Sequence, residues 1–297
     1  MTIGEYVKKP TEMEQVSSFS TGSGALLGKQ LVKSGKLTEG DVLRIIDVQR
    51  MNNLRFGEAA VTLGLLKSHD IEEVLAAQFD YPYPSEGNSE FSPLLVAANQ
   101  PYGVQSEALR ALRIHLMVGW LKANQQCLAV TSCRGGEGAS SIAANLAIVF
   151  AQMGERTLLI DANFRRPVQH LLFGLKPLAG LSSLLNGRCS INDTLTGVPP
   201  FRFLSVICAG APPPNPQELL GRVTFSYLLE TAPAAFDIVI IDTAPILDYA
   251  DAQIVSSRAS GCLLVTRRNE SRLSDVRRVT SVLAVSQTKL VGTVVNE

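Results

Sequence analysis

The segment TSCRGGEGASS, from Thr131 to Ser141, constrains the fold of this chain more than any other part of its sequence. It starts at the end of the apolar run CLAVTS and leads into IAANLAIVFAQMG, a stretch typical of a helix. A glycine-rich turn between a strand and a helix directs successive backbone N–H groups, and the positive end of the helix dipole, toward one point. The segment therefore predicts a phosphate-binding loop, and a plain strand-to-helix turn is the alternative.

Short apolar runs typical of strands recur beyond this loop. They are RTLLIDA, LSVICA, FDIVIID, CLLVTR and LVGTVVN, and helical stretches separate most of them. A helix is also expected near residues 106–123, before the first strand. This alternation is the pattern of a sheet with helices on both faces. We therefore predict the α/β fold class, with a P-loop doubly wound parallel sheet preceded by a small all-α N-terminal domain.

An internal repeat organises the N-terminal part of the chain. LGKQLVKSG and VLRIIDVQ are followed, 29 positions further on, by FGEAAVTLG and IEEVLAAQ. Each copy predicts a helix, a glycine stop, a polar turn and a second helix, so two copies should pair into one compact module. We divide the 297 residues into a disordered tail (1–22), a helical tandem-repeat domain (23–80), a linker (81–102) and a P-loop domain (103–297).

The charge balance and the absence of long apolar runs exclude several functions. Lysine and arginine together number 27, as do aspartate and glutamate, so a broad basic surface for nucleic acid is not indicated. The N-terminus has no apolar core of a signal peptide, and no run of about 18 apolar residues occurs. We expect a cytoplasmic protein, and any link to a membrane would come through a partner.

The glycine loop resembles a known motif. RGGEGASS is similar to KGGxGK[ST], the deviant phosphate loop of MinD- and ParA-type proteins and of bacterial tyrosine kinases. Arg134 matches the first basic position and Ser140 the Mg²⁺-binding hydroxyl, whereas Ala139 stands where the family has its phosphate-binding lysine. The resemblance implies that ATP or ADP is held by Arg134, Gly135, Gly136, Glu137, Gly138, Ala139, Ser140 and Ser141.

Two later segments resemble the acidic motifs of the same kinases. LLIDANFRRP is similar to an apolar strand followed by DxDxR, with Asp161 and Arg165 matching and Asn163 replacing the second acid. An amide is a weaker Mg²⁺ ligand than a carboxylate, and Asp161 alone could also be a strand-end cap. FDIVIIDTAP is similar to the Walker B strand, which ends here in Asp242.

The resemblance assigns these residues to a reaction centre. It implies a catalytic set of Asp161, Asn163, Arg165 and Asp242, and a Mg²⁺ site of Ser140, Asp161 and Asp242. It further implies nucleotide contacts from Asp251, the family's downstream acid, and from Asn296, which would read the adenine edge. A terminal asparagine is also common as a simple turn residue.

Two more motifs narrow the family. Glu107, Arg110 and Arg113 form ExxRxxR on the helix before the first strand, and PPPNPQELL matches a motif of the exopolysaccharide branch. Residues 103–297 thus resemble the bacterial tyrosine autokinases associated with exopolysaccharide chain-length determinants. The resemblance implies a homo-oligomer joined through Glu107, Arg110 and Arg113, and a membrane chain-length-determinant or export protein as partner. A solvated helix face is the alternative for these three residues.

The N-terminal repeat has its own resemblance. RxGxxLxxxGxxxxxxLxxxLxxQ, present twice, is similar to the cyclic-di-GMP-binding N-terminal domain of type II secretion and pilus ATPases. Leu26 replaces the arginine of the first copy, and leucine can neither bind phosphate nor stack on guanine. A module that only docks a partner is the alternative. The implied ligand residues are Leu26, Gly28, Gly35, Gln49, Arg55, Gly57, Gly64 and Gln78.

The sequence therefore predicts a regulator of exopolysaccharide polymerisation or export, held at the inner membrane by its partner. Ala139, Asn163 and the lack of tyrosines after Tyr249 favour a nucleotide-binding protein with impaired phosphotransfer over an active tyrosine kinase. A ParA- or MinD-like ATPase is the third hypothesis, disfavoured by ExxRxxR and the N-terminal repeat.

Overall fold

The computed structural model describes residues 23–67, 70–71, 74, 91–121 and 125–297. These residues form two compact units, one within residues 23–74 and one within residues 91–297, and each is considered by itself. The predicted tail (1–22) and the first part of the predicted linker, up to residue 90, lie outside the described residues.

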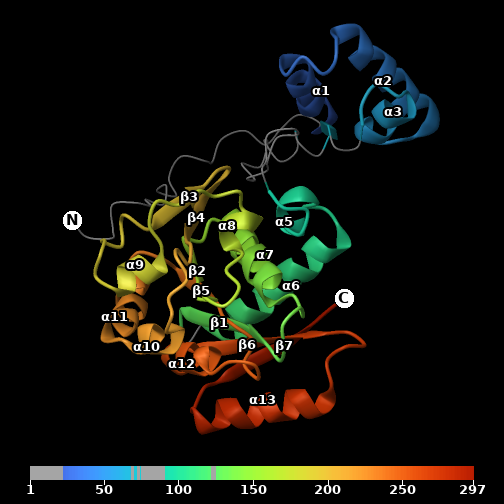
Figure 1. Cartoon of the computed structure of the whole chain (residues 1–297). Coiled ribbons are helices and arrows are strands. Elements are labelled where there is room, and N and C mark those ends of the chain that lie inside the picture. Colours follow the sequence, from blue (N-terminus) through green and yellow to red (C-terminus); the bar gives the residue numbers. More distant parts are fainter. Residues whose placement is uncertain (1–22, 68–69, 72–73, 75–90, 122–124) are drawn as a thin grey trace. The chain divides into compact units, whose positions relative to one another are not determined.

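The larger unit is built on a seven-stranded sheet in the order β3-β4-β2-β5-β1-β6-β7 (Figure 1). All neighbouring strands run parallel except the edge pair β3 and β4. The strands are β1 (Cys127–Ser132), β2 (Thr157–Asp161), β3 (Leu195–Val198), β4 (Phe201–Ile207), β5 (Ile238–Asp242), β6 (Gly261–Arg267) and β7 (Leu290–Asn296).

The predicted doubly wound α/β fold is confirmed. The central strands β1, β2 and β5 are buried along their whole length, as expected for parallel strands covered on both faces. Strand β3 was not predicted, because Val198 is the only buried residue of its four and the strand lies at the edge of the sheet.

Helices cover both faces of this sheet and enclose two apolar cores (Figure 1). One core contains α5 (Val96–Asn99), α6 (Val104–Gly119) and α7 (Ala139–Gln152). The opposite core contains α9 (Leu181–Leu185), α10 (Pro216–Gly221), α11 (Val223–Thr231), α12 (Asp251–Arg258) and α13 (Leu273–Val285). The short helix α8 (Gln169–Leu172) follows β2 and contributes Leu172 to the first core.

Part of the predicted linker belongs to this unit. Leu95, Ala97 and Ala98 are buried in the first core, so the described residues 91–102 are not an open connection. A buried amide fixes them: Asn145 of α7 accepts the N–H of Ala97 (2.8 Å) and donates to the carbonyl of Leu94 (2.8 Å). The sequence missed this packing because α5 has only four residues, too few to show a helical period.

The smaller unit contains the repeat. Helices α1 (Ser23–Lys33), α2 (Glu39–Asn52) and α3 (Phe56–Thr62) lie where the repeat predicts them, and residues 70, 71 and 74 are again helical. Their apolar faces share one core around Leu31, Ile45 and Phe56. Lys36 and Asp70, one from each copy, form an ion pair of 2.6 Å between Nζ and Oδ1.

Packing and backbone geometry explain the glycines of the repeat. Gly35 (φ +74°) and Gly64 (φ +66°) end their helices in the left-handed conformation that glycine favours. A Cβ at Gly28 would lie 3.3 Å from Val42, and one at Gly57 would lie 3.1 Å from Ile71. Each of these four glycines therefore has a structural reason that is independent of any ligand.

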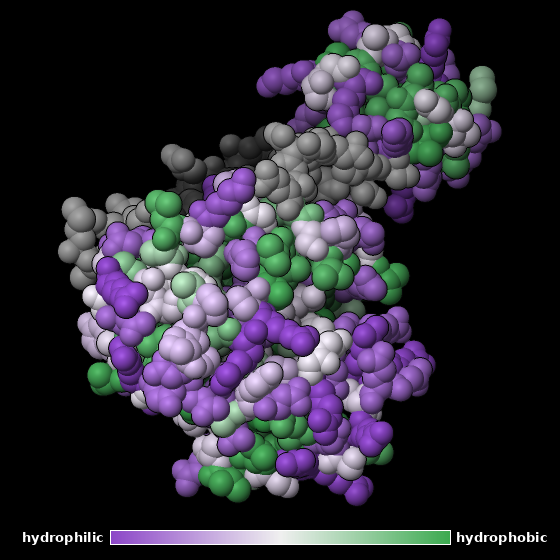
Figure 2. All heavy atoms as spheres, viewed as in Figure 1, coloured by the Kyte–Doolittle hydropathy of each residue, from purple (hydrophilic) through white to green (hydrophobic). Residues whose placement is uncertain are grey.

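The face shown in Figure 2 is mostly polar, with hydrophobic residues in small groups. Among the described residues, none of the helices combines the length and the apolar character needed to cross a membrane.

Candidate nucleotide site

The glycine loop joins β1 to α7 at the edge of the sheet where parallel strands β1, β2 and β5 all end. Gly138 caps α7 with φ +93°, and Gly136 has φ +92°, so both occupy conformations that favour glycine. Nothing lies within 4 Å of a Cβ built on Gly136, so the space beside its Cα is open. The loop therefore has the backbone geometry of a phosphate site.

The Walker B candidate Asp242 lies at the centre of a hydrogen-bonded group. Ser140 donates its hydroxyl to Asp242 Oδ1 (3.0 Å), and Gln169 donates its amide to Asp242 Oδ2 (2.7 Å). The same amide of Gln169 also donates to the carbonyl of Ser140 (3.1 Å). Gln169 thereby ties the start of α7 to the end of β5, a role that no sequence pattern predicted.

Asp161 lies beside Asp242, because the two residues are register partners on neighbouring strands. Asp161 Oδ1 accepts the N–H of Asn163 (3.2 Å). Its Oδ2 accepts the N–H groups of Val168 (3.2 Å) and Gln169 (3.1 Å). The carboxylate therefore holds the β2–α8 loop in place, so the cap hypothesis and the metal-site hypothesis both apply to it.

Burial changes the acidity of this pair. Burial raises the pKa of Asp242 to about 6, opposed by the hydrogen bonds from Gln169 and Ser140. Burial, and next the charge of Asp242, raise the pKa of Asp161 well above its ordinary value. In the described part of the chain neither carboxylate forms an ion pair with a cation. The pair is thus a negative centre without a counter-charge, which is the environment that a divalent cation would stabilise.

The two replaced positions keep structural roles but lose the family's charges. Ala139 is 7% exposed and ends at its Cβ, so it offers a phosphate only its backbone N–H. Asn163 is buried, and its side-chain oxygen accepts the N–H of Arg166 (3.2 Å). This oxygen is already used to shape the loop, and an amide adds no negative charge to the predicted metal site.

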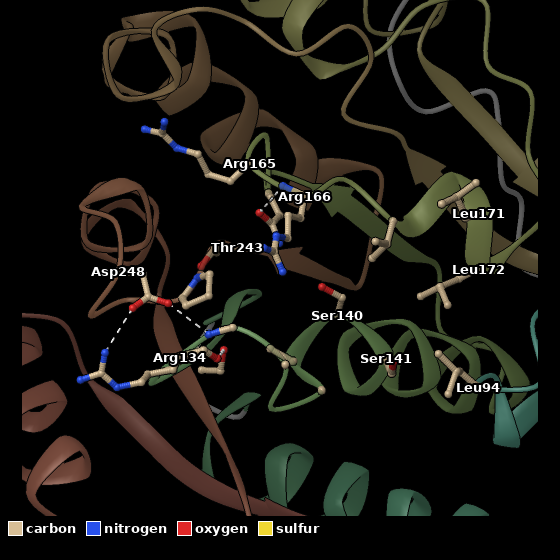
Figure 3. Close-up of a pocket in the computed structure, with 18 of the residues that line it drawn as sticks. Leu94, Arg134, Ser140, Ser141, Arg165, Arg166, Leu171, Leu172, Thr243 and Asp248 are labelled. Carbon is tan, nitrogen blue, oxygen red and sulfur yellow. Dashed lines mark hydrogen bonds and ion pairs between the residues drawn. The ribbon is translucent and has the colours of Figure 1, made fainter. Parts of the chain in front are cut away.

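The predicted catalytic Arg165 and the predicted nucleotide residue Asp251 bind each other. Arg165 Nε and Nη2 donate to the buried carboxylate of Asp251 at 2.9 and 3.2 Å, and the guanidinium lies 4.7 Å from the ring centre of Tyr249. Figure 3 shows Arg165 directed away from Ser140. The structure therefore gives Asp251 an ion-pair partner, and its contact with a nucleotide stays a prediction.

Arg134 is held within its own chain. Its Nε donates to Asp275 (3.0 Å) and its Nη1 to Asp248 (3.5 Å). The hydrogen bond from Arg134 lowers the pKa of Asp275. The second oxygen of Asp248 accepts the N–H of Gly135 (3.1 Å), so a carboxylate occupies one N–H of the loop (Figure 3).

Glu137 and Asn296 hold the glycine loop in place through hydrogen bonds to its backbone. The buried carboxylate of Glu137 accepts the N–H of Arg134 (3.0 Å) and the hydroxyl of Ser271. Asn296, at the end of β7, donates its amide to the carbonyl of Glu137 (3.1 Å). A Cβ on Gly138 would lie 2.2 Å from that amide nitrogen. Asn296 was predicted to read adenine, and the structure assigns it a loop-supporting contact.

The loop opens into a cavity of about 750 Å³. Its walls come from the glycine loop, the β2–α8 loop, α8 and the segment after β5 (Figure 3). The predicted residues that line it are Arg134, Gly135, Gly136, Gly138, Ala139, Ser140, Ser141, Asn163 and Arg165. The other residues that line it include Arg166, Thr243, Asp248 and Tyr249, for which the sequence predicted no role.

Comparison with known proteins identifies the family. The tyrosine-protein kinase YwqD of Bacillus subtilis is 37% identical over 202 residues, which are 68% of this chain and 85% of that protein. The chain belongs to the bacterial tyrosine-protein kinase family. The family described as cellulose biosynthesis protein BcsQ matches residues 125–175.

Solved structures have the same architecture. The kinase domain of Escherichia coli tyrosine kinase ETK superposes with a TM-score of 0.67 at 32% identity, covering 71% of this chain and 82% of that one. The chimerical protein CapA2B2 superposes with a TM-score of 0.65 at 32% identity, covering 76% of this chain and 98% of that one.

The three residues of the predicted ExxRxxR stripe on α6 do not form a continuous charged surface. Glu107 has a side chain that is 74% exposed, but the Arg110 side chain is only 17% exposed and donates to Glu107 (2.9 Å) and to the carbonyl of Pro101. Arg113 donates to the carbonyl of Val149 on α7 (2.6 Å). Both arginines reach backbone carbonyls of their own chain, which a helical spacing alone could not reveal.

The predicted residues of the smaller unit are described in part. Arg55 precedes α3 and is exposed, and among the described residues its guanidinium has no partner. Gln49, near the end of α2, is partly buried, and its carbonyl accepts the N–H of Leu54 (3.2 Å). Leu26 is in α1 without a described side chain, and Gln78 lies outside the described residues.

Proposed function

We propose that this chain binds ADP or ATP with Mg²⁺ at the glycine loop and regulates exopolysaccharide polymerisation or export with little or no phosphotransfer of its own. The observation that carries the proposal is the intact strand–loop–helix geometry, with Ala139 where the family has lysine. Backbone N–H groups, the hydroxyl of Ser140 and the dipole of α7 are sufficient for phosphate binding. Calorimetric titration of the full chain with MgADP and MgATP tests the binding.

The residues present fit a Mg²⁺ ion. Ser140, Asp161 and Asp242 supply oxygen ligands at one point, and their buried carboxylates lack a cationic partner within the described residues. A bound Mg²⁺ would neutralise phosphate charge. Protein residues would orient it: Ser140 and Gln169 fix Asp242, and three backbone N–H groups fix Asp161.

Impaired transfer follows from the missing charges. The lysine of the family motif would stabilise charge that develops on the transferred phosphate, and each 1.36 kcal/mol of lost stabilisation slows the reaction about tenfold. ATP turnover and phosphotyrosine blotting of the purified chain test this point. Robust Mg²⁺-dependent phosphotyrosine formation that disappears in Asp242→Ala would contradict the proposal and support an active kinase.

Assembly into a homo-oligomer through α6 is part of the proposal. Val104, Ala108, Ala111, Ile114 and Val118 are exposed and repeat at helical spacing, so α6 presents an apolar stripe next to Glu107. Because Arg110 and Arg113 are bound within the chain, the stripe would supply most of the contact area.

The oligomer test uses this stripe. Val118→Glu should lower the mass measured by light scattering, because it places a charge in an apolar contact. Val223→Glu, on the exposed part of α11, is the matched control and should leave the mass unchanged. A wild-type chain that is monomeric at all concentrations would contradict the oligomer.

The smaller unit is proposed to bind cyclic-di-GMP. Its support is the sequence resemblance and the exposed guanidinium of Arg55, which could bind phosphate or stack on guanine. The four glycines argue for the fold rather than for the ligand. In a calorimetric titration of the full chain with cyclic-di-GMP, Arg55→Ala should weaken the affinity about tenfold or more. Arg44→Ala is the control and should leave the affinity unchanged. Absence of heat at submillimolar ligand would contradict this part.

A membrane chain-length-determinant or export protein is the proposed partner, on the strength of the resemblance to the exopolysaccharide branch. The test is copurification with the cytoplasmic segment of such a protein. A complex that forms only with nucleotide present would link the partner to the glycine loop, and no complex under either condition would contradict the partner.

A further inference from the structure

The cavity holds one side-chain cation that the proposed function has not used. Three arginines line it: Arg134, Arg165 and Arg166. Arg134 is paired with Asp275 and Asp248, and Arg165 is paired with Asp251. Within the described part of the chain, the guanidinium of Arg166 forms neither an ion pair nor a hydrogen bond.

The position of Arg166 is set by its backbone. Its N–H donates to the side-chain oxygen of Asn163 (3.2 Å), and Asp161 holds the same loop through three N–H groups. The exposed side chain leaves this fixed loop and points into the cavity on the side of Ser140, whereas that of Arg165 points away (Figure 3). A free cation is thus directed at the start of α7 from the opposite wall.

The charges around the cavity favour such a cation. Asp248 lines the cavity, and the buried acids Asp161 and Asp242 end the neighbouring strands β2 and β5. Ala139 contributes no charge at the position of the motif's lysine. Terminal phosphates bound at the loop would need a cation besides Mg²⁺. A guanidinium offers five N–H donors in a planar fork that matches phosphate oxygens.

We propose that Arg166 binds the terminal phosphates of the nucleotide and replaces, from the β2–α8 loop, the lysine that Ala139 lacks. This assignment rests on the proposed nucleotide binding. The positive charge would then come from the β2–α8 loop and not from the glycine loop. Nucleotide binding would be retained, with the charge approaching the phosphates from the opposite side of the cavity.

The test compares the affinities of full-chain variants for MgADP and MgATP by calorimetry. Arg166→Gln should weaken binding about tenfold to a hundredfold, the value of a hydrogen bond to a charged group. Arg166→Lys should retain part of the affinity because it keeps a point charge. Arg188→Gln removes an exposed arginine outside the cavity and should leave binding unchanged.

A rescue experiment separates replacement of the lysine from a general effect of charge. Ala139→Lys combined with Arg166→Gln should restore most of the lost affinity, because both side chains would serve the same phosphates. Thermal unfolding without ligand should be the same for wild type and Arg166→Gln, since this guanidinium has no protein partner among the described residues.

The possible failures are distinct. Binding by Arg166→Gln within about twofold of wild type would overturn the assignment and leave the proposed function standing. Loss of affinity that Ala139→Lys does not restore would overturn replacement of the lysine. A wild-type chain that binds neither nucleotide would overturn both the assignment and the proposed function.

Discussion

The substitution Asp242→Asn should stabilise the metal-free protein at neutral and alkaline pH, although it removes the central acid of the site. Burial raises the pKa of Asp242 from 3.8 to about 6. The folded chain therefore holds this proton more tightly than the unfolded chain does. Between pH 3.8 and 6 the unfolded state loses the proton first, so stability falls as pH rises through this window and stays low above it.

The magnitude follows from the two pKa values. Their difference corresponds to about 3 kcal/mol of lost stability above pH 6, at 1.36 kcal/mol for each pH unit. An amide at this position would face the donor of Gln169, whose own Oε1 is buried and has no partner within the described residues. A flip of Gln169 makes Oε1 the acceptor but gives up the bond to the Ser140 carbonyl, at a cost of about 1 kcal/mol. The net gain at pH 8 is about 2 kcal/mol.

Thermal unfolding in the presence of a chelator measures this effect. For a unit of this size, about 2 kcal/mol raises the Tm by about 4–8 °C. Wild type should lose stability between pH 4 and 7, whereas Asp242→Asn should lose less. Mg²⁺ should stabilise wild type and not the variant. Glu230→Gln, at an exposed position on α11, is the control and should follow wild type.

Two results would refute the reasoning. One is a variant that is less stable than wild type at pH 8 without metal. The other is a pair of stability curves that stay parallel from pH 4 to 8, because the buried carboxylate would then not hold its proton as described.

Three further predictions concern the same unit. Gly180→Ala should lower the free energy of unfolding in chemical denaturation by at least about 2 kcal/mol, since its Cβ would lie 2.4 Å from the backbone nitrogen of Gly210. Gly197→Ala is the control and should change that free energy little, because nothing lies within 4 Å of its Cβ. Asp248→Asn should tighten MgADP binding roughly fivefold in calorimetry, because the substitution removes a negative charge that lies beside the loop and repels phosphate. Unchanged or weaker binding would show that Asp248 does not compete with phosphate. Ala139→Lys should tighten ATP binding more than it restores turnover, and adding Asn163→Asp should raise turnover further; full activity from Ala139→Lys alone would mean that the amide at 163 is harmless.

Most of the fold was predictable because its signals are local. The run CLAVTS, the glycines after it and the alanine-rich helix are neighbours in sequence, and their order determines strand, loop and helix. Apolar runs ending in Asp161 and Asp242 placed both acids at strand ends, where the structure has them. The edge strand β3 and the packed residues 91–102 were missed, because only one residue of β3 is buried and the helix within 91–102 has four residues. Neither segment is long enough to leave a clear periodic pattern.

The sequence by itself determined the order of strand, glycine loop and helix and placed an alanine at position 139, since both depend on residues that are adjacent in the chain. Only the tertiary structure decided how the charges are paired. Strand order brings β2 beside β5 and β5 beside β1, so Asp161 meets Asp242 and Gln169 joins Ser140 across long stretches of chain. A hydrogen bond needs its two atoms within about 3 Å, and spacing along the sequence does not fix that distance between separate strands.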